Sequence, residues 1–365
     1  MSKKLRIIAF YLPQFHQIPE NDEWWGKGFT EWTNVGKAKP LFKGHYQPRV
    51  PADLGYYDLR LPETREAQAQ MAKKHGIEGF CYWHYWFGNG KELLERPFNE
   101  VLKSGKPDYS FCLGWANHSW KAKTWIIGGE DKILIEQKYP GIEDYSNHFF
   151  SVLPAFQDKR YIRVKNKPLF IIWDPDDFPD ISLFIKHWNV LAKSNGLDGI
   201  YFVAYSLIRK NISNYLEMGF DSVTFDFISE LFKSRSLFYK VFFKACNLFL
   251  SVPKVINYNQ YIKVVLKNFE VIDNIFPCIL PNYDHSPRSG KHAWVLTNAT
   301  PDNFGKLLES LLIKVRQKRN EENIIFIKSW NEWGEGNYLE PDLKYGDGYL
   351  VKIHELLDKY GTDLS

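Results

Sequence analysis

Short apolar runs recur along the whole chain and alternate with amphipathic stretches. Eight of these runs are rich in Ile, Phe and Val, and they occupy residues 5–12, 77–83, 109–115, 168–174, 200–206, 221–227, 276–282 and 324–330. Because successive positions are apolar, rather than every second one, each run is typical of a strand buried on both faces of a parallel sheet. The pattern therefore predicts eight parallel strands.

The stretches between the runs carry helix signals. Residues 62–76, 180–196 and 300–319 have a proline near their start, a glycine at their end, or both. These are the residues that commonly mark the two ends of a helix. Eight strand–helix alternations in 365 residues favour a single (β/α)8 barrel domain over residues 1–365, rather than an open doubly wound sheet.

Two long connections interrupt this rhythm. Residues 17–60 are rich in Pro and Gly, and we expect an ordered loop that covers the mouth of the barrel. Residues 229–273, between the sixth and seventh strands, should form a helical insertion. Its part from 231 to 269 has seven basic residues and no acidic one, whereas the whole chain carries a net charge of +4. The insertion could simply pack on the barrel, or it could bind something anionic, such as a lipid surface, a lipid-linked glycan or an acidic polysaccharide.

The composition fits a protein with a large core, since 44% of the residues are hydrophobic. No apolar stretch reaches the ~18 residues of a membrane span, and the apolar run before Pro13 is too short for a secretory leader. The four cysteines form no CxxC pair, so free thiols are expected. We expect a cytoplasmic protein, with the basic insertion as a means of peripheral attachment to the inner face of the membrane.

Aromatic residues make up 17% of the chain, and many lie beside polar residues just after an apolar run. In a (β/α)8 barrel the loops after the strands surround the active site. Aromatic rings can pack on the C–H face of a pyranose, while polar side chains bind its hydroxyls. The candidate substrate-binding residues are Tyr11, His16, Trp32, Trp83, His84, Tyr85, Trp86, Trp115, Asn117, Trp120, Trp173, Asn282, Tyr283, Asp284, Trp330, Asn331 and Trp333; Gln14, His118 and His285 follow the same strands.

The segment IIFIKSWNEWGEGNYLEPD, residues 324–342, contains the strongest catalytic candidates, Glu332 and Glu335. Residues three apart on a straight strand point to opposite faces, but Gly334 and Gly336 let the chain turn so that both carboxylates can face the mouth. A pair of carboxylates, one ionised and one protonated in an apolar setting, is the usual equipment for glycosidic bond chemistry. The plainer alternative is that one glutamate caps a turn and the other is solvated.

Other kinds of site have little support in the sequence. It contains no HExxH motif, no paired Cys/His spacing and no Gly-rich phosphate loop, so we expect neither a metal nor a cofactor, and no nucleic-acid partner. Asp174-Pro175-Asp176-Asp177 is similar to the acidic motif by which nucleotide-sugar transferases hold a divalent metal. However, Pro and Asp just after a strand also form ordinary turns.

Three motifs resemble the WbsX family of polysaccharide-locus proteins: FYLPQFHQIPENDEWWGKGFTEWTNV (10–35), GHYQPRVPADLGYYDLR (44–60) and SWNEWGEGNYLEPD (329–342). The likeness covers almost the whole chain. That family is often labelled glycosyltransferase, yet it is similar to glycoside hydrolase family 99, whose members are retaining endo-acting α-mannosidases built on a (β/α)8 barrel.

The resemblance also implies roles for the two glutamates. The family-99 pattern Asn-Glu-Trp-His-Glu-Gly corresponds to residues 331–336, where Gly334 stands in place of the histidine. By this likeness Glu332 is the base that activates the 2-hydroxyl of the sugar, which attacks C1 to give a 1,2-anhydro intermediate. Glu335 is then the acid for the leaving group and the base for the incoming water. The missing histidine bears on the identity of the substrate more than on the type of reaction.

These features favour a carbohydrate-active enzyme, a retaining glycoside hydrolase or transglycosylase that acts on a bacterial surface polysaccharide without a cofactor. A glycosyltransferase of O-antigen or lipopolysaccharide biosynthesis is the alternative within catalysis. A glycan-binding barrel without catalytic activity is the alternative outside it.

Overall fold

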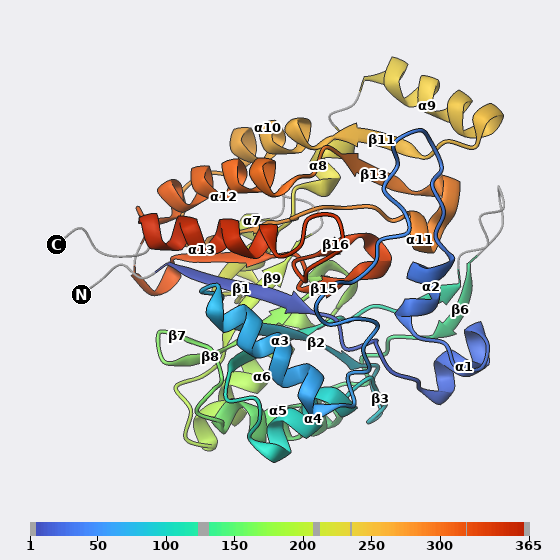
Figure 1. The fold of residues 1–365 in the computed structure, drawn as a ribbon. Coiled ribbons are helices and arrows are strands. Elements are labelled where there is room, and N and C mark those ends of the chain that lie inside the picture. The colour runs from blue at the N-terminus through green and yellow to red at the C-terminus, as the bar shows by residue number, and fades with distance from the viewer. Residues whose placement is uncertain (1–4, 123–130, 207–211, 234–235, 319, 361–365) are drawn as a thin grey trace.

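The protein folds as a closed parallel β-barrel surrounded by helices (Figure 1). The computed structural model describes residues 5–122, 131–206, 212–233, 236–318 and 320–360. The barrel strands are β1 (Arg6–Tyr11), β2 (Gly79–Trp86), β4 (Ser110–Trp115), β8 (Lys167–Ile172), β9 (Tyr201–Tyr205), β10 (Ser222–Phe225), β12 (Ile275–Ile279) and β14 (Ile324–Ile327). Each of the eight apolar runs overlaps one of these strands, so the prediction of a (β/α)8 barrel is confirmed.

The barrel closes because the last strand pairs with the first. Neighbouring strands in chain order pair in parallel, from β1 with β2 through β12 with β14. β14 then returns to β1, with Ile325 opposite Ile7. The strands are almost entirely buried, because helices cover their outer face and side chains fill the inside.

The helices around the barrel follow the expected alternation. They are α3 (Pro62–Lys74), α4 (Arg96–Ser104), α5 (Ile142–Gln157), α6 (Ile181–Ser194), α7 (Ile212–Glu217), α10 (Tyr258–Asn268), α12 (Pro301–Val315) and α13 (Gly348–Tyr360). The helices predicted at 62–76, 180–196 and 300–319 are α3, α6 and α12. Thr300 caps α12, since its hydroxyl accepts a hydrogen bond from the Asn303 amide at 3.3 Å.

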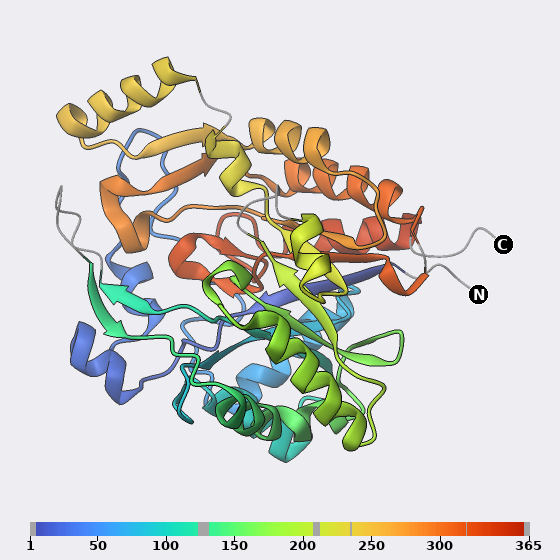
Figure 2. The same cartoon turned by 180° about the vertical axis from the view of Figure 1, so that it is seen from behind.

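Several short elements gather at the carboxyl ends of the strands (Figures 1 and 2). The long loop 17–60 contributes α1 (Pro19–Trp25) and α2 (Glu31–Lys37). Other connections contribute the hairpin of β5 (Trp120–Ala122) and β6 (Lys132–Ile135), helix α11 (Ser286–Ser289), and the hairpin of β15 (Asn331–Glu332) and β16 (Asn337–Tyr338) with the turn η5 (Trp333–Glu335) inside it. The remaining short elements are β3 (Glu92–Leu93), β7 (Arg163–Val164), η1 (Pro175–Asp177), η3 (Gly290–His292) and η4 (Asn320–Glu322).

The insertion at 229–273 differs from an all-helical segment. It contains the end of α8 (Ile228–Lys233), then α9 (Leu237–Leu250), β11 (Lys254–Asn257) and α10. β11 pairs in parallel with β13 (Trp294–Thr297), which follows the seventh barrel strand, so the insertion adds a small second sheet. Residues 234–235 lie outside the described residues. Within the described parts of the chain, no helix is long and apolar enough to cross a membrane.

Candidate active site

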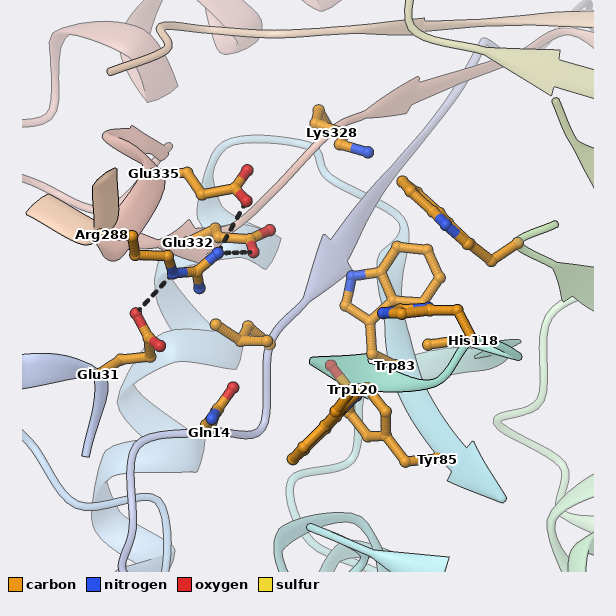
Figure 3. Close-up of a pocket in the computed structure, with 13 residues that line it drawn as sticks. Gln14, Glu31, Trp83, Tyr85, His118, Trp120, Arg288, Lys328, Glu332 and Glu335 are labelled. Carbon is orange, nitrogen blue, oxygen red and sulfur yellow. Dashed lines mark hydrogen bonds and ion pairs between the residues drawn. The ribbon is translucent and has the colours of Figure 1, made fainter. Parts of the chain in front are cut away.

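A pocket of about 260 Å³ opens at the carboxyl ends of the barrel strands. Its lining consists of Leu12, Gln14, Glu31, Trp83, Tyr85, Ala116, His118, Trp120, Trp173, Arg288, Lys328, Glu332 and Glu335. Figure 3 shows two opposing sides: acidic residues and Arg288 on one, and the aromatic residues Trp83, Tyr85 and Trp120 on the other. This arrangement can bind a ligand that is apolar on one face and polar on the other.

The backbone turn η5 brings Glu332 and Glu335 to the same side of the pocket. Gly336, which ends the turn, has a φ of +51°, a conformation that glycine adopts without strain. Gly334 has no room for a side chain, because a Cβ there would lie 2.0 Å from Glu31 Oε2 and 2.9 Å from Arg288 Nε. Glu31 and Arg288 therefore fill the space beside Gly334, where the family-99 pattern has a histidine.

Arg288 joins the acidic residues of the pocket. Its Nη1 donates hydrogen bonds to Glu335 Oε1 at 2.7 Å and to Glu332 Oε1 at 3.2 Å, and its Nε donates to Glu31 Oε2 at 3.1 Å. Burial opposes the charge of the guanidinium, but the three carboxylates raise the pKa of Arg288 above its usual value. The shared Nη1 also keeps the Glu332 and Glu335 carboxyl groups close together.

The two glutamates differ in their affinity for a proton. Burial, with the charge of Glu335, raises the pKa of Glu332 to about 7. Glu335 is buried as well, but a hydrogen bond from His285 and the charge of Arg288 lower its pKa to about 2. Of the two, Glu332 therefore binds a proton more readily.

Lys328, at the end of β14, places a buried cation beneath the aromatic side. Its Nζ lies 4.1 Å from the centre of the Trp173 ring and donates a hydrogen bond to the Tyr205 hydroxyl at 2.7 Å. The carboxylate of Asp226 lies 3.3 Å from the same nitrogen. The ring of Trp83 meets Trp173 edge to face. Lys328 thus holds Trp173 in place, and its charge favours the ionised form of both catalytic candidates.

The pocket continues outward into a second, wider hollow of about 600 Å³. The two share Gln14, Glu31, His118, Trp120 and Arg288, and the outer part extends over α1, α2 and the start of β5. Its lining includes Trp25, which is 47% exposed. The combined cleft is long enough for a ligand larger than a single sugar ring.

Six of the predicted site residues line the inner pocket, namely Trp83, Tyr85, Trp120, Trp173, Glu332 and Glu335. The other predicted residues do not line it: Tyr11, His16, Trp32, His84, Trp86, Trp115, Asn117, Asn282, Tyr283, Asp284, Trp330, Asn331 and Trp333. Most of these are buried and bonded to other parts of the fold. Asn331, for example, exchanges two hydrogen bonds with the backbone of Leu12 at 2.8 and 3.0 Å.

Several of these residues join neighbouring parts of the fold through hydrogen bonds. His45 and Gln47 both contact Asp284 Oδ2 at 2.7 Å, which ties the loop 17–60 to the segment after β12. His84 contacts His148 of α5 at 2.8 Å, and the Trp86 indole donates to Asp144 of the same helix at 3.1 Å. These side chains lie on the outer face of β2, away from the pocket.

The sequence-based list lacked Glu31, Arg288 and Lys328. A lysine inside the apolar run 324–330 was a signal for Lys328, because lysine is seldom buried without a partner. Glu31 lies inside a quoted family motif, whereas Arg288 follows β12 in a short polar stretch with no recognisable pattern. Asp174–Asp177 form the turn η1, with Asp176 accepting a hydrogen bond from Tyr215 at 2.7 Å. The described residues contain no group of three His, Cys, Asp or Glu side chains placed to hold a metal ion.

The sequence of the chain matches the model of one protein family. Residues 7–353 match the model of the family described as "Glycosyltransferase WbsX". Two curated relatives are both called uncharacterized protein WxcX, and they come from two strains of Xanthomonas campestris pv. campestris. Each is 32% identical to this chain over 354 residues. The match covers 97% of this chain and 50% of those proteins, so the chain spans about half the length of the curated relatives it matches.

Solved structures share the fold. A GH99 endo-α-mannosidase from Bacteroides thetaiotaomicron is similar with a TM-score of 0.55 and 15% identity, over 97% of both chains. A protein named glycoside hydrolase-like protein is similar with a TM-score of 0.57 and 14% identity, over 99% of this chain and 95% of that one. At this level of identity the likeness concerns the fold.

Proposed function

We propose that this chain, which belongs to the WbsX family, is a retaining glycoside hydrolase or transglycosylase that acts on a bacterial surface polysaccharide through Glu332 and Glu335. The observation that supports this most is the carboxylate pair bound to one guanidinium nitrogen, opposite an aromatic wall at the mouth of the barrel. Aromatic rings can pack on the apolar face of a sugar while the acidic side meets its hydroxyls and the glycosidic oxygen.

In the first step Glu332 takes the proton of the 2-hydroxyl, and O2 attacks C1 of the same sugar. The bond from C1 to the leaving oxygen breaks, and that oxygen takes the proton of Glu335. In the second step Glu335 takes a proton from water or from an acceptor hydroxyl, whose oxygen attacks C1 and opens the 1,2-anhydro ring. Glu332 returns its proton to O2. Two inversions at C1 give net retention.

The proton of the pair must move for these roles to hold. Before a sugar binds, Glu332, whose pKa is raised to about 7, binds a proton more readily than Glu335, whose pKa is lowered to about 2. Both carboxylates contact the same Arg288 nitrogen, so the proton has a short distance to travel when the sugar displaces the present contacts. The close approach also suits retaining enzymes, since inverting pairs are separated by about 6.5–9.5 Å.

Kinetics with two kinds of substrate test the roles. Glu335→Gln should lower turnover of the natural glycan by about 10²–10⁴-fold. It should spare the first step with an aryl glycoside, measured as the initial release of the aryl alcohol, because a good leaving group needs no proton. Glu332→Gln should impair both substrates. The exposed Glu136→Gln serves as the control. If the two variants exchange behaviours, Glu332 is the acid; if neither variant loses activity, the pair is not catalytic.

The family description favours a glycosyltransferase as the second candidate. A transferase of that kind uses a sugar nucleotide as donor. The two functions separate in a product assay, since a transferase releases a nucleotide and a hydrolase or transglycosylase does not. A glycan-binding barrel would instead keep its affinity, and show no turnover, with or without glutamine at residues 332 and 335.

A further inference from the structure

Helix α9 projects from the body of the molecule at the end where the barrel opens (Figures 1 and 2). It rests on the small sheet of the insertion through a few contacts on one side. The Tyr239 hydroxyl donates to the Val255 carbonyl at 2.7 Å, and the Asn247 amide donates to the carbonyls of Lys291 and Val252. Tyr239, Phe243 and Asn247 recur at helical spacing and form this inner side.

The other side of α9 presents apolar side chains to solvent. Val241 is 60% exposed, Leu248 70%, Phe249 79% and Leu250 69%. Val241, Lys244 and Leu248 share one face, and Phe249 flanks it. Leu250 is exposed at the end of the helix, on the side of Phe243. Four large apolar side chains on one projecting helix are unusual for a surface that meets only water, and they indicate an interaction site.

Charge distinguishes the possible partners. Residues 231–269 contain seven basic residues and no acidic one. Helix α9 itself has Lys240 and Lys244 and no acidic residue, so two copies of it would repel each other, whereas an anionic surface would attract it. α9 has 14 residues, fewer than the roughly 20 that cross a bilayer, so it fits a helix that lies in the plane of a membrane surface.

We propose that α9 binds the surface of an anionic lipid bilayer, with Val241, Leu248 and Phe249 in the boundary between headgroups and acyl chains and Lys244 among the phosphates. Since α9 lies at the mouth end of the barrel, the bound protein would turn its cleft toward the membrane. The inference goes beyond the proposed function, because binding requires neither glutamate.

Flotation with lipid vesicles tests this binding. The full chain should bind vesicles of phosphatidylcholine with one quarter phosphatidylglycerol at low salt, and bind pure phosphatidylcholine at least about tenfold more weakly. Leu248→Ser with Phe249→Ser and Leu250→Ser should lower the partition coefficient at least about tenfold at any salt concentration. Lys244→Gln should lower it about fivefold at low salt only, since Lys244 is exposed and salt screens exposed charges.

Helix α6 offers matched controls. Leu183 and Val190 are 48% and 62% exposed there, and Lys186 and Lys193 are exposed on the same helix. Leu183→Ser with Val190→Ser, and Lys186→Gln with Lys193→Gln, should leave vesicle binding unchanged. Circular dichroism checks the fold of each variant, and Glu335→Gln should bind vesicles like the unchanged protein even if the proposed chemistry fails.

The opposite results are equally clear. The proposal is overturned if the unchanged protein floats with neither kind of vesicle, or if the α6 variants lose as much binding as the α9 variants. It is also overturned if vesicle binding is absent and sedimentation shows that the unchanged protein is a dimer and that, among the variants, only the α9 serine variant is a monomer. In that case the apolar side of α9 serves a second copy of the chain.

Discussion

At the scale of single residues, the candidate site depends on Arg288 and on the space left by Gly334. The sequence identified Glu332 and Glu335 because two glutamates follow a buried strand between tryptophans. It could not identify Arg288, since that side chain comes from a different loop and meets the glutamates only in the folded barrel. The presence of Gly334 in the sequence also did not predict that Glu31 would fill the space beside this glycine.

Gly334→Ala tests this close packing. The new methyl group would overlap Glu31 Oε2 and crowd Arg288, so we expect a loss of about 1–3 kcal/mol in the free energy of unfolding and lower activity. Glu31→Ala should cost less in the Gly334→Ala background than alone, because it removes the overlap. Urea denaturation of the four proteins measures this coupling. Gly36→Ala, at a helical site with no atom within 4 Å of the new Cβ, is the control. Additive losses would contradict the packing argument.

At the scale of elements, the strands were predictable and the direction of their side chains was less so. On β2, Trp83 and Tyr85 line the pocket, while His84 and Trp86 face α5. Alternate residues of a strand point to opposite faces, but the apolar run alone does not say which set faces inward. β11 was missed because its four residues pair with a segment about 40 positions away in the chain.

The turn η5, between Glu332 and Gly336, is held by a buried carboxyl group that the sequence analysis did not select. Glu340 accepts hydrogen bonds from the Trp333 indole at 2.6 Å, the Tyr57 hydroxyl at 2.8 Å and the Gln68 amide at 2.7 Å. These partners come from η5, from the loop 17–60 and from α3. Burial raises the pKa of Glu340 to about 7, and the hydrogen bonds oppose that rise.

Glu340→Gln should therefore change stability in a pH-dependent way. A folded-state pKa above the unfolded value contributes stability below the unfolded pKa, and this is lost as the pH rises through about 7. Glutamine does not titrate, and its NH2 group meets one of the three donors, so we expect a loss of about 1–3 kcal/mol at pH 5. The deficit should shrink by about 2–3 kcal/mol between pH 5 and 8.

Urea denaturation at several pH values measures this effect. The exposed Glu136→Gln, compared in the same way, should show no such trend. A deficit that stays constant between pH 5 and 8 would mean that the hydrogen bonds outweigh burial and that Glu340 is ionised throughout this range.

At the scale of the whole molecule, the barrel was predictable because each strand and helix repeats a local pattern. The position of the cleft followed from the barrel, since loops after the strands meet at one end. The size of the cleft did not, because α1, α2 and the β5–β6 hairpin pack together from separate loops. The outer hollow of about 600 Å³ next to an inner pocket of about 260 Å³ is a property of the assembled fold.

This two-part cleft predicts that affinity increases with the length of the glycan. An inner pocket of this size accommodates about one sugar ring, so further rings must lie in the outer part beside Trp25. With the Glu335→Gln protein, which should bind without turnover, a tetrasaccharide from the polysaccharide repeat should bind at least about tenfold more tightly than a disaccharide. One stacked ring contributes on the order of 0.5–1.5 kcal/mol, and the added hydrogen bonds contribute the rest.

Trp25→Ala should remove most of this advantage and leave disaccharide binding unchanged, because Trp25 does not line the inner pocket. Calorimetric titration measures both affinities. Equal affinity for the disaccharide and the tetrasaccharide would mean that only the inner pocket binds the glycan, which favours cleavage at the end of a polysaccharide. Tighter binding of the tetrasaccharide favours cleavage within the polysaccharide.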